Sequence, residues 1–495
     1  MLVLFAIAIV IVVIAGINFT NFSTALTPMR IKSINTQKVL GGEESVIRLA
    51  LILEAMFISV FSYFIGLLLV YMTGKTSIAS LIDADITLSA HWGLVWLTAL
   101  IAIATGIFSG IYPSYYMTSF PPALVLKGSF GLSPKGRQLR NVLIGIQFVA
   151  SFGLIIGATF MYLQNYYMQN TPLGYDKEEI IITNMNNNIR KSFSGIEEVT
   201  YAEMLLSSQD QYMGWGRKYR DKDIQFQCLP VESSFLKVMN VKISEGRDFR
   251  EEDKAKRYGT FVFNERARTE YGLEIGSLID SMEIVGFMPD VKFASFRTEV
   301  TPMAFFVWGT NNWGNQPNYA YIKVKAGSDL RGAMQHVKTT LQSFDPEYPF
   351  NVRFFDEVLN GLYEKERSLS SLITLFSLIA IFISVVGVFG LVVFDSEYRK
   401  KEIGIRKVLG STTEEIIVMF NKTYIRILCV CFVLGAPIAG YVVHRWLENF
   451  AYKTPMYWWV YLIAFAIIAV ITILTVTFQN WRAANENPVH SIKNE

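Results

Sequence analysis

The sequence predicts an α-helical membrane protein with seven transmembrane helices and one α/β domain outside the cytoplasm, and three observations support this. The chain has 495 residues, of which 52% are hydrophobic and only 18% are charged, a balance too apolar for an ordinary soluble protein. Seven long segments are almost free of charge, and residues 165–366 form the one large polar block. The net charge of +3 is small and indicates no nucleic-acid partner.

Each charge-poor segment is close to the length that crosses a bilayer as a helix, roughly 20 apolar residues. Glu54 is the one acid deep inside such a segment. Aromatic residues gather near the segment ends, as at Trp92 and Trp458, and belts of this kind mark the membrane–water interface. The expected membrane helices cover residues 1–29, 49–74, 92–117, 141–164, 368–394, 427–443 and 454–481.

Short basic segments set the orientation of these helices. Lysine and arginine concentrate in residues 30–48, 127–140 and 398–407, and loops rich in these residues stay in the cytoplasm. Seven helices satisfy all three constraints if the N-terminus lies outside and the tail with Arg482 lies inside. Residues 165–366 then lie outside the cytoplasmic membrane, and the bilayer itself is the first expected partner.

The polar block has the pattern of a mixed α/β domain. Short runs of β-branched and aromatic residues between turn residues predict strands, and residues 329–344 predict a helix with Asp329 as its N-cap. Residues 356–376 contain no helix breaker except Gly361, which predicts one helix that either couples motion into the membrane or merely links the two parts. The predicted strands cover 179–184, 259–265, 282–288, 319–327 and 350–355.

The chain contains an internal repeat. Seven residues of the segment 30–41 recur 369 positions later in 399–410, and PPALVLKG (121–128) is echoed 366 positions later by NPVHSIKN (487–494). Each copy runs through a helix, a basic insert, two further helices and a proline-containing tail. We therefore divide the chain into a first transmembrane unit of three helices (1–120), a cytoplasmic linker (121–140), a transmembrane helix (141–164), the outer domain (165–366), a second transmembrane unit of three helices (367–482) and a cytoplasmic tail (483–495).

The first copy lacks the preceding helix and outer domain that the second copy has. Met1 leads directly into apolar sequence without the charged n-region of a signal peptide. We therefore expect the chain to be the latter part of a longer duplicated protein with a further helix and outer domain upstream. Helix 1–20 should then pack on 47–73 and 92–117 and leave an apolar face bare.

The basic insert of the second copy, EYRKKEIGIRKVLGSTTEEI (397–416), predicts a short amphipathic helix at the cytoplasmic surface. Ile405, Val408 and Leu409 share one apolar stripe with helical spacing, and Glu402 and Arg406 lie on another face. Such a helix either anchors to lipid through its cations or docks into a cytoplasmic partner. Repetition at the same point of both copies favours docking, because two related docks suit a dimeric partner.

The segment KKEIGIRKVLGST (400–412) between two membrane helices resembles the signature of FtsX-like permeases, the membrane subunits of MacB-type ABC transporters. The polar block resembles the MacB-type periplasmic core domain in motifs such as VESSFLKVMNVKISEGRDF (231–249) and FNERARTEYG (263–272). The resemblance covers essentially the whole chain. It implies a permease in the bacterial cytoplasmic (inner) membrane with residues 165–366 in the periplasm.

In that family a cytoplasmic ATPase dimer drives movement of the periplasmic domain, which is called mechanotransmission. The resemblance implies a permease that handles a peptide, lipoprotein or drug-like substrate, with a periplasmic adaptor or envelope protein as a further partner. The alternative is a non-transporting FtsX-like transducer that activates an envelope enzyme. The resemblance assigns coupling to the ATPase to Arg399, Lys401, Glu402, Ile403, Ile405, Arg406, Lys407, Val408, Leu409 and Gly410, and more weakly to Arg30, Lys32, Lys38, Val39, Leu40 and Gly41.

No catalytic or metal site is expected in this chain. TGKTS (73–77) lacks the first glycine of a phosphate loop, since Leu69 stands there, so we expect ATP and magnesium on the partner ATPase and no cofactor here. The four histidines are scattered, and the three cysteines form no disulfide framework. Glu54 is open to two interpretations, a packing or coupling hydrogen bond or a functional proton.

Overall fold

The chain separates into two compact units in the computed structural model. The first, helical unit comprises residues 1–164, 367–446 and 455–495, and the second, outer unit comprises residues 165–366 and 447–454. The structure describes residues 2–74, 76, 85, 87–122, 134–185, 199–206, 213–292, 296–311, 318–361, 363–398 and 400–484.

Seven helices of the described residues are long and apolar enough to cross a membrane, which confirms the predicted number. Several run beyond the predicted spans, because a helix continues through charged residues at which a count of uncharged positions stops; the span at 413–447 is an example. The helices are α1 (Leu2–Ala25), α2 (Thr27–Val39), α3 (Glu44–Thr73), α4 (Trp92–Thr118), α6 (Pro134–Asn170), α13 (Glu364–Tyr398), α14 (Lys400–Val408), α15 (Thr413–Leu447) and α16 (Trp458–Ala484), with a 3₁₀ turn η2 (Leu88–Ala90) before α4.

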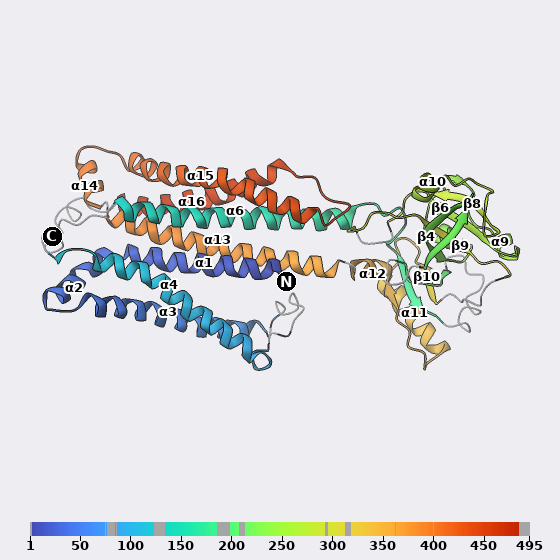
Figure 1. The fold of residues 1–495 in the computed structure, drawn as a ribbon, viewed down its shortest axis with the longest axis horizontal. Coiled ribbons are helices and arrows are strands. Elements are labelled where there is room, and N and C mark those ends of the chain that lie inside the picture. Colours follow the sequence, from blue (N-terminus) through green and yellow to red (C-terminus); the bar gives the residue numbers. More distant parts are fainter. Residues whose placement is uncertain are drawn as a thin grey trace. The chain divides into compact units, whose positions relative to one another are not determined.

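The repeat is visible in the element order of the helical unit. A long helix, a short helix and two long helices occur first as α1 to α4 and again as α13 to α16. The short helices α2 and α14 lie at the same end of the helical unit (Figure 1). The predicted basic inserts therefore form helices at matching places in both copies.

The two copies meet where α1 packs against α13 and α6. Asn18 of α1 donates from Nδ2 to the carbonyl of Ile383 at 2.6 Å, and Gln147 of α6 donates to Asn18 Oδ1. A Cβ on Gly387 would lie 2.0 Å from Asn18 Oδ1. Asn18 and Gly387 are 369 positions apart, so the copies touch at repeat-related positions, as elements related by a two-fold axis do.

Helix α6 packs closely against α15 of the second copy, at a glycine of α15. A Cβ added to Gly435 would lie 3.3 Å from Val149 Cα of α6, whereas its repeat counterpart Gly66 on α3 has open space around it. Phe152 of α6 also stacks with Phe465 of α16 at 6.4 Å between ring centroids. Helix 1–20 is expected to pack on both 47–73 and 92–117; α1 contacts α4, which meets the second expectation, but it has no comparable contact with α3 among the described residues.

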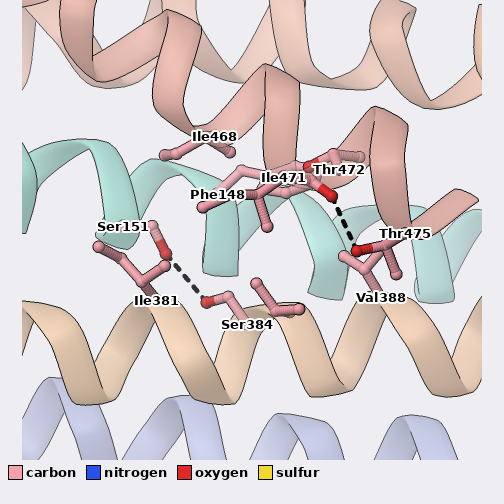
Figure 2. A pocket seen from close by; sticks show the side chains of 10 residues that line it. Phe148, Ser151, Ile381, Ser384, Val388, Ile468, Ile471, Thr472 and Thr475 are labelled. Atoms are coloured by element: carbon pink, nitrogen blue, oxygen red, sulfur yellow. Dashed lines mark hydrogen bonds between the residues drawn. The ribbon is translucent and has the colours of Figure 1, made fainter.

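A pocket lies among α6, α13 and α16 (Figure 2). Ser151 and Ser384 face each other there with their hydroxyls 2.9 Å apart. The repeat-related place in the first copy is close-packed, because Gly16 lets α1 approach α4 until its Cβ position lies 2.9 Å from Ser109 Oγ. Val385 stands at the position of Gly16 in the second copy and lines the pocket.

The outer unit is an α/β structure built on two sheets, as predicted for the polar block. One sheet has four antiparallel strands in the order β11-β1-β10-β2, and the other has seven strands in the order β3-β4-β9-β6-β8-β5 with β7 paired to β8. The second sheet is mixed, since β4–β9 and β6–β8 are parallel pairs. The strands are β1 (Ile180–Asn184), β2 (Val199–Ala202), β3 (Met213–Tyr219), β4 (Lys222–Pro230), β5 (Glu245–Gly246), β6 (Thr260–Asn264), β7 (Leu278–Ile279), β8 (Met282–Met288), β9 (Met303–Val307), β10 (Tyr319–Lys323) and β11 (Arg353–Phe354).

Short helices complete the outer unit, and one sequence prediction is wrong there. Asp329 caps α11 as predicted, accepting from the amide of Arg331 at 3.1 Å. The single helix predicted over 356–376 is instead two, because Tyr363 forms a turn between α12 and α13, just after the breaker Gly361. The helices are α8 (Phe235–Val238), α9 (Glu251–Ala255), α10 (Glu265–Tyr271), α11 (Leu330–Phe344) and α12 (Phe355–Gly361).

Candidate functional site

Helix α2 runs antiparallel beside the first turns of α3. Arg30, near the start of α2, pairs with Glu54, and Lys38, near its end, pairs with Glu44 at the start of α3. The inner face of α2 buries Ile31, Ile34 and Asn35, and α2 also contacts α4. This helix is therefore held to its own unit by both charge and packing.

Arg30 and Glu54 form a two-point ion pair. The guanidinium donates from Nη2 to Glu54 Oε1 at 2.7 Å and from Nη1 to Oε2 at 2.8 Å. Glu54 lies ten residues beyond Glu44, about 15 Å along the helix, within the membrane span 44–73. A charged side chain within a membrane span is costly, and the pairing with Arg30 offsets part of that cost. Of the two interpretations of Glu54, the structure favours the packing or coupling hydrogen bond.

The end of α2 is joined to both α3 and α4. Lys38 Nζ donates to Glu44 Oε1 at 2.5 Å and to the carbonyl of Thr118 at 2.6 Å. Arg48 donates to Glu44 Oε2 at 2.7 Å and to Thr118 Oγ1 at 2.8 Å. Two cations thus share the same two partners, Glu44 and Thr118, as in a network rather than an isolated surface pair. We call Arg30, Lys38, Glu44, Arg48, Glu54 and Thr118 the α2 ion-pair cluster.

The two short helices end with the same backbone geometry. Gly41 and Gly410 follow them with φ of +92° and +97°, the left-handed conformation in which glycine commonly ends a helix. The amide of Gly41 donates to Lys38 O at 3.1 Å, and that of Gly410 donates to Lys407 O at 3.0 Å. The segments 30–41 and 399–410 therefore correspond in hydrogen bonding over their shared final turn as well as in sequence.

Both endings expose the same pair of apolar side chains. Val39 and Leu40 are 61% and 82% exposed, and Val408 and Leu409 are 68% and 80% exposed. The high and nearly equal exposed fractions show that neither pair of side chains is covered by the rest of its own copy. Two large apolar side chains at a helix end, with lysines beside them, make a compact surface for a partner or for lipid.

The rest of α14 has one buried and one exposed apolar side chain. Ile403 is 3% exposed and Ile405 is half-exposed, so Ile403 packs against its surroundings while Ile405 extends the apolar stripe towards Val408 and Leu409. Glu402 accepts from Arg406 Nη2 at 3.0 Å within the helix. α14 contacts α16.

The remaining coupling residues are placed as follows. Lys32 is exposed, and Lys407 is half-buried and makes no ion pair among the residues that the structure describes. Arg399 and the side chain of Lys401 lie outside the described part of the chain. In each copy, the predicted coupling residues that the structure describes thus lie together on the short helix, α2 or α14, and in the turn that follows it.

Sequence reasoning missed Glu44, Arg48 and Thr118 as parts of the site. A signal existed for two of them, because Glu44 and Arg48 are spaced i, i+4 at the start of a helix. Thr118 could not be found, because it reaches Lys38 from 80 positions away through a backbone carbonyl.

Two acids of the outer unit, Asp253 and Glu203, have shifted pKa values. Asp253 is buried, and although burial alone would raise its pKa, hydrogen bonds from Arg247 and from the amide of Arg250 hold that pKa below its usual value. Burial raises the pKa of Glu203, which lies apart from this pair. Among the described residues, no group of three or more histidine, cysteine and carboxylate side chains could hold a metal ion.

A family description matches this chain twice. The model of the FtsX-like permease C-terminal region matches residues 5–122 and 374–488. The two matched segments contain α2 and α14, so each basic helix lies in one copy of the same family region.

Curated relatives include the macrolide export ATP-binding/permease proteins MacB of Chromobacterium violaceum and Escherichia coli (strain K12). Both are 23% identical, over 230 and 233 residues, which is 44% of this chain and 35% of each relative. The chain thus matches about a third of the length of these relatives. Among solved structures, the periplasmic region of MacB from Actinobacillus actinomycetemcomitans is similar over 38% of this chain and 93% of that one (TM-score 0.27, 12% identity). The extracellular domain of YknZ from Gram-positive bacteria is similar over 37% and 91% (TM-score 0.25, 13% identity).

Proposed function

We propose that this chain, which belongs to the FtsX-like permease family and is a multi-pass protein of the bacterial inner membrane with a periplasmic segment, is the membrane subunit of an ABC transporter. A separate cytoplasmic ATPase dimer binds ATP and magnesium and docks on the short basic helices. Its closure moves the periplasmic unit by mechanotransmission. The substrate is a peptide, a lipoprotein or a drug-like molecule that is exported or handled at the envelope.

One observation carries this proposal: two repeat-related helices end alike and present the same uncovered Val–Leu pair, Val39 with Leu40 and Val408 with Leu409. Fully burying a side chain of this size contributes about 1.5–3 kcal/mol, which is enough for a pair to anchor a docked subunit. Two such pairs at the same end of the helical unit (Figure 1) suit a partner with two similar subunits.

The cations beside these pairs support a protein partner with an acidic pocket. Lys407 adjoins Val408 in the second copy and makes no ion pair among the described residues, whereas Lys38, which adjoins Val39, is paired with Glu44. The competing explanation is lipid anchoring, in which the same side chains enter the bilayer and the same cations meet anionic headgroups. The two explanations differ in what a charge at the apolar position does to ATPase binding.

The test is Leu409→Glu with Leu409→Met as the matched control. The charged variant should insert into membranes normally and lose co-purification of a protein with ATP-binding cassette motifs, identified by mass spectrometry. The methionine variant should retain it, because its side chain fills an apolar pocket of similar size. Undiminished co-purification with Leu409→Glu would contradict docking through α14 and support lipid anchoring.

A further inference from the structure

We propose that the two coupling helices have diverged into a fixed one and a movable one: the α2 ion-pair cluster holds α2 to α3 and α4, and α14 lacks the residues that would hold it in the same way. The proposal deepens the proposed function, because it states which copy can follow a docked partner. It can also be tested on the chain alone.

The first step is that the α2 ion-pair cluster attaches both ends of α2 to the neighbouring helices. Arg30 fixes the start of α2 to Glu54 with bonds of 2.7 and 2.8 Å, and Lys38 fixes its end to Glu44 and to the carbonyl of Thr118. The two attachment points, Arg30 and Lys38, lie about two turns apart on α2 and resist both swinging and sliding of the helix. The attachment at Glu54 lies within the membrane span 44–73, where separating the two charges is costly.

The second step is the loss of the partners in the other copy. The cations of α2 recur, since Arg399 and Lys407 stand 369 positions after Arg30 and Lys38. Their partners do not recur: the counterparts of Glu44, Arg48 and Glu54 are Thr413, Ile417 and Thr423, and Ala484 stands 366 positions after Thr118.

The backbone shows that the two short helices end at corresponding positions, although α2 begins at Thr27 and α14 only at Lys400. α2 ends at Val39 and α14 ends at Val408, while α3 begins at Glu44 and α15 begins at Thr413, so both boundaries are shifted by 369 positions. Lys407 therefore stands towards Thr413 as Lys38 stands towards Glu44. Thr413 has no carboxylate, and Lys407 makes no ion pair among the described residues. The acids of this turn stand one and two positions later, at Glu414 and Glu415, and Glu415 accepts from the amide of Thr412. The helix ending is preserved, and the acid that would face Lys407 at position 413 is absent.

The third step concerns the positive charge that each short helix can present to a partner. In the first copy Lys38 is neutralised inside the unit, so it has little charge to offer a partner. In the second copy Lys407 keeps its charge beside the exposed Val408 and Leu409. Among the described residues, Lys407 of α14 can therefore meet an acidic partner surface without first breaking an ion pair to the bundle.

The test transfers the missing attachment into the second copy. Thr413→Glu together with Ile417→Arg supplies the counterparts of Glu44 and Arg48, and Thr413→Gln with Ile417→Gln is the uncharged control. The full chain is reconstituted in bilayer nanodiscs without nucleotide or ATPase, and amide hydrogen exchange is followed by mass spectrometry. Peptides from 30–41 should exchange roughly tenfold more slowly than peptides from 400–410 in the unaltered chain.

The transfer should slow exchange in 400–410 towards the rate of 30–41, and the uncharged control should leave it unchanged. Glu44→Gln, which alters the exposed end of the cluster and spares the inner pair, should speed exchange in 30–41 with little effect on 400–410. Equal exchange of the two helices in the unaltered chain, or no slowing by the transferred pair in a folded variant, would overturn the proposal. These measurements need no partner, so they stand apart from the co-purification that tests docking.

Discussion

The two basic helices of this protein share an ending and differ in what surrounds it. Gly41 and Gly410 turn the chain in the same left-handed conformation, and Leu40 and Leu409 are exposed to almost the same extent. Around α2, acids on α3 pair with the cations, whereas the matching positions beside α14 are threonines. The comparison teaches that a repeat can keep a binding surface in both copies while only one copy keeps the contacts that hold it still.

The largest effect is expected from Glu54→Ala, compared with Thr423→Ala at the repeat-related position. Removing the carboxylate deprives Arg30 of two charge-assisted hydrogen bonds, which should lower the free energy of unfolding by about 2–3 kcal/mol. Thr423→Ala should change it by less than about 0.5 kcal/mol, because that hydroxyl has only a 3.4 Å contact with a carbonyl in its own helix.

The measurement is unfolding of the purified chain in mixed micelles as the fraction of denaturing detergent rises. The double variant Arg30→Met with Glu54→Met serves as the control, and it should recover most of the loss because no charge is left alone. Equal stability of the two alanine variants would show that the ion pair does not hold α2 in the membrane.

The next largest loss of stability is expected where α6, the helix that only the second copy has, packs against α15. Gly435 packs on the backbone of Val149 in α6, and Gly66 has open space around it. Gly435→Leu should therefore lower stability by about 1–3 kcal/mol through overpacking, and Gly66→Leu should have little effect in the same unfolding assay. A loss at Gly66 as large as that at Gly435 would mean that the face of α3 around Gly66 is covered.

Sequence reasoning predicted the repeat and the membrane helices from local signals. Lys38 to Gly41 and Lys407 to Gly410 spell the same four residues, and uncharged stretches report directly on burial in lipid. The pairing of Arg30 with Glu54 was not predicted, because it depends on how α2 and α3 lie side by side, and residue spacing does not give that register. The contact of Asn18 with Gly387 was hidden for the same reason.

The smallest loss of stability is expected from substituting the glycines that end the two short helices, and it should be equal in both copies. Gly41→Ala and Gly410→Ala place a Cβ in open space but force an L-residue into the left-handed conformation, which costs roughly 1–2 kcal/mol. The losses in the free energy of unfolding caused by the two substitutions should differ from each other by less than this conformational cost. A loss confined to one of them would show that the two helix endings are not equivalent.

The most direct measurement of the central claim compares Leu409→Glu with Leu40→Glu in one co-purification experiment. The two leucines are 80% and 82% exposed, so neither substitution disturbs a packed core and any difference reports on docking. The account predicts that Leu409→Glu abolishes recovery of the ATPase and that Leu40→Glu reduces it less, because α14 is the helix free to engage. Full recovery with Leu409→Glu, or an equal loss with both variants, would contradict the account.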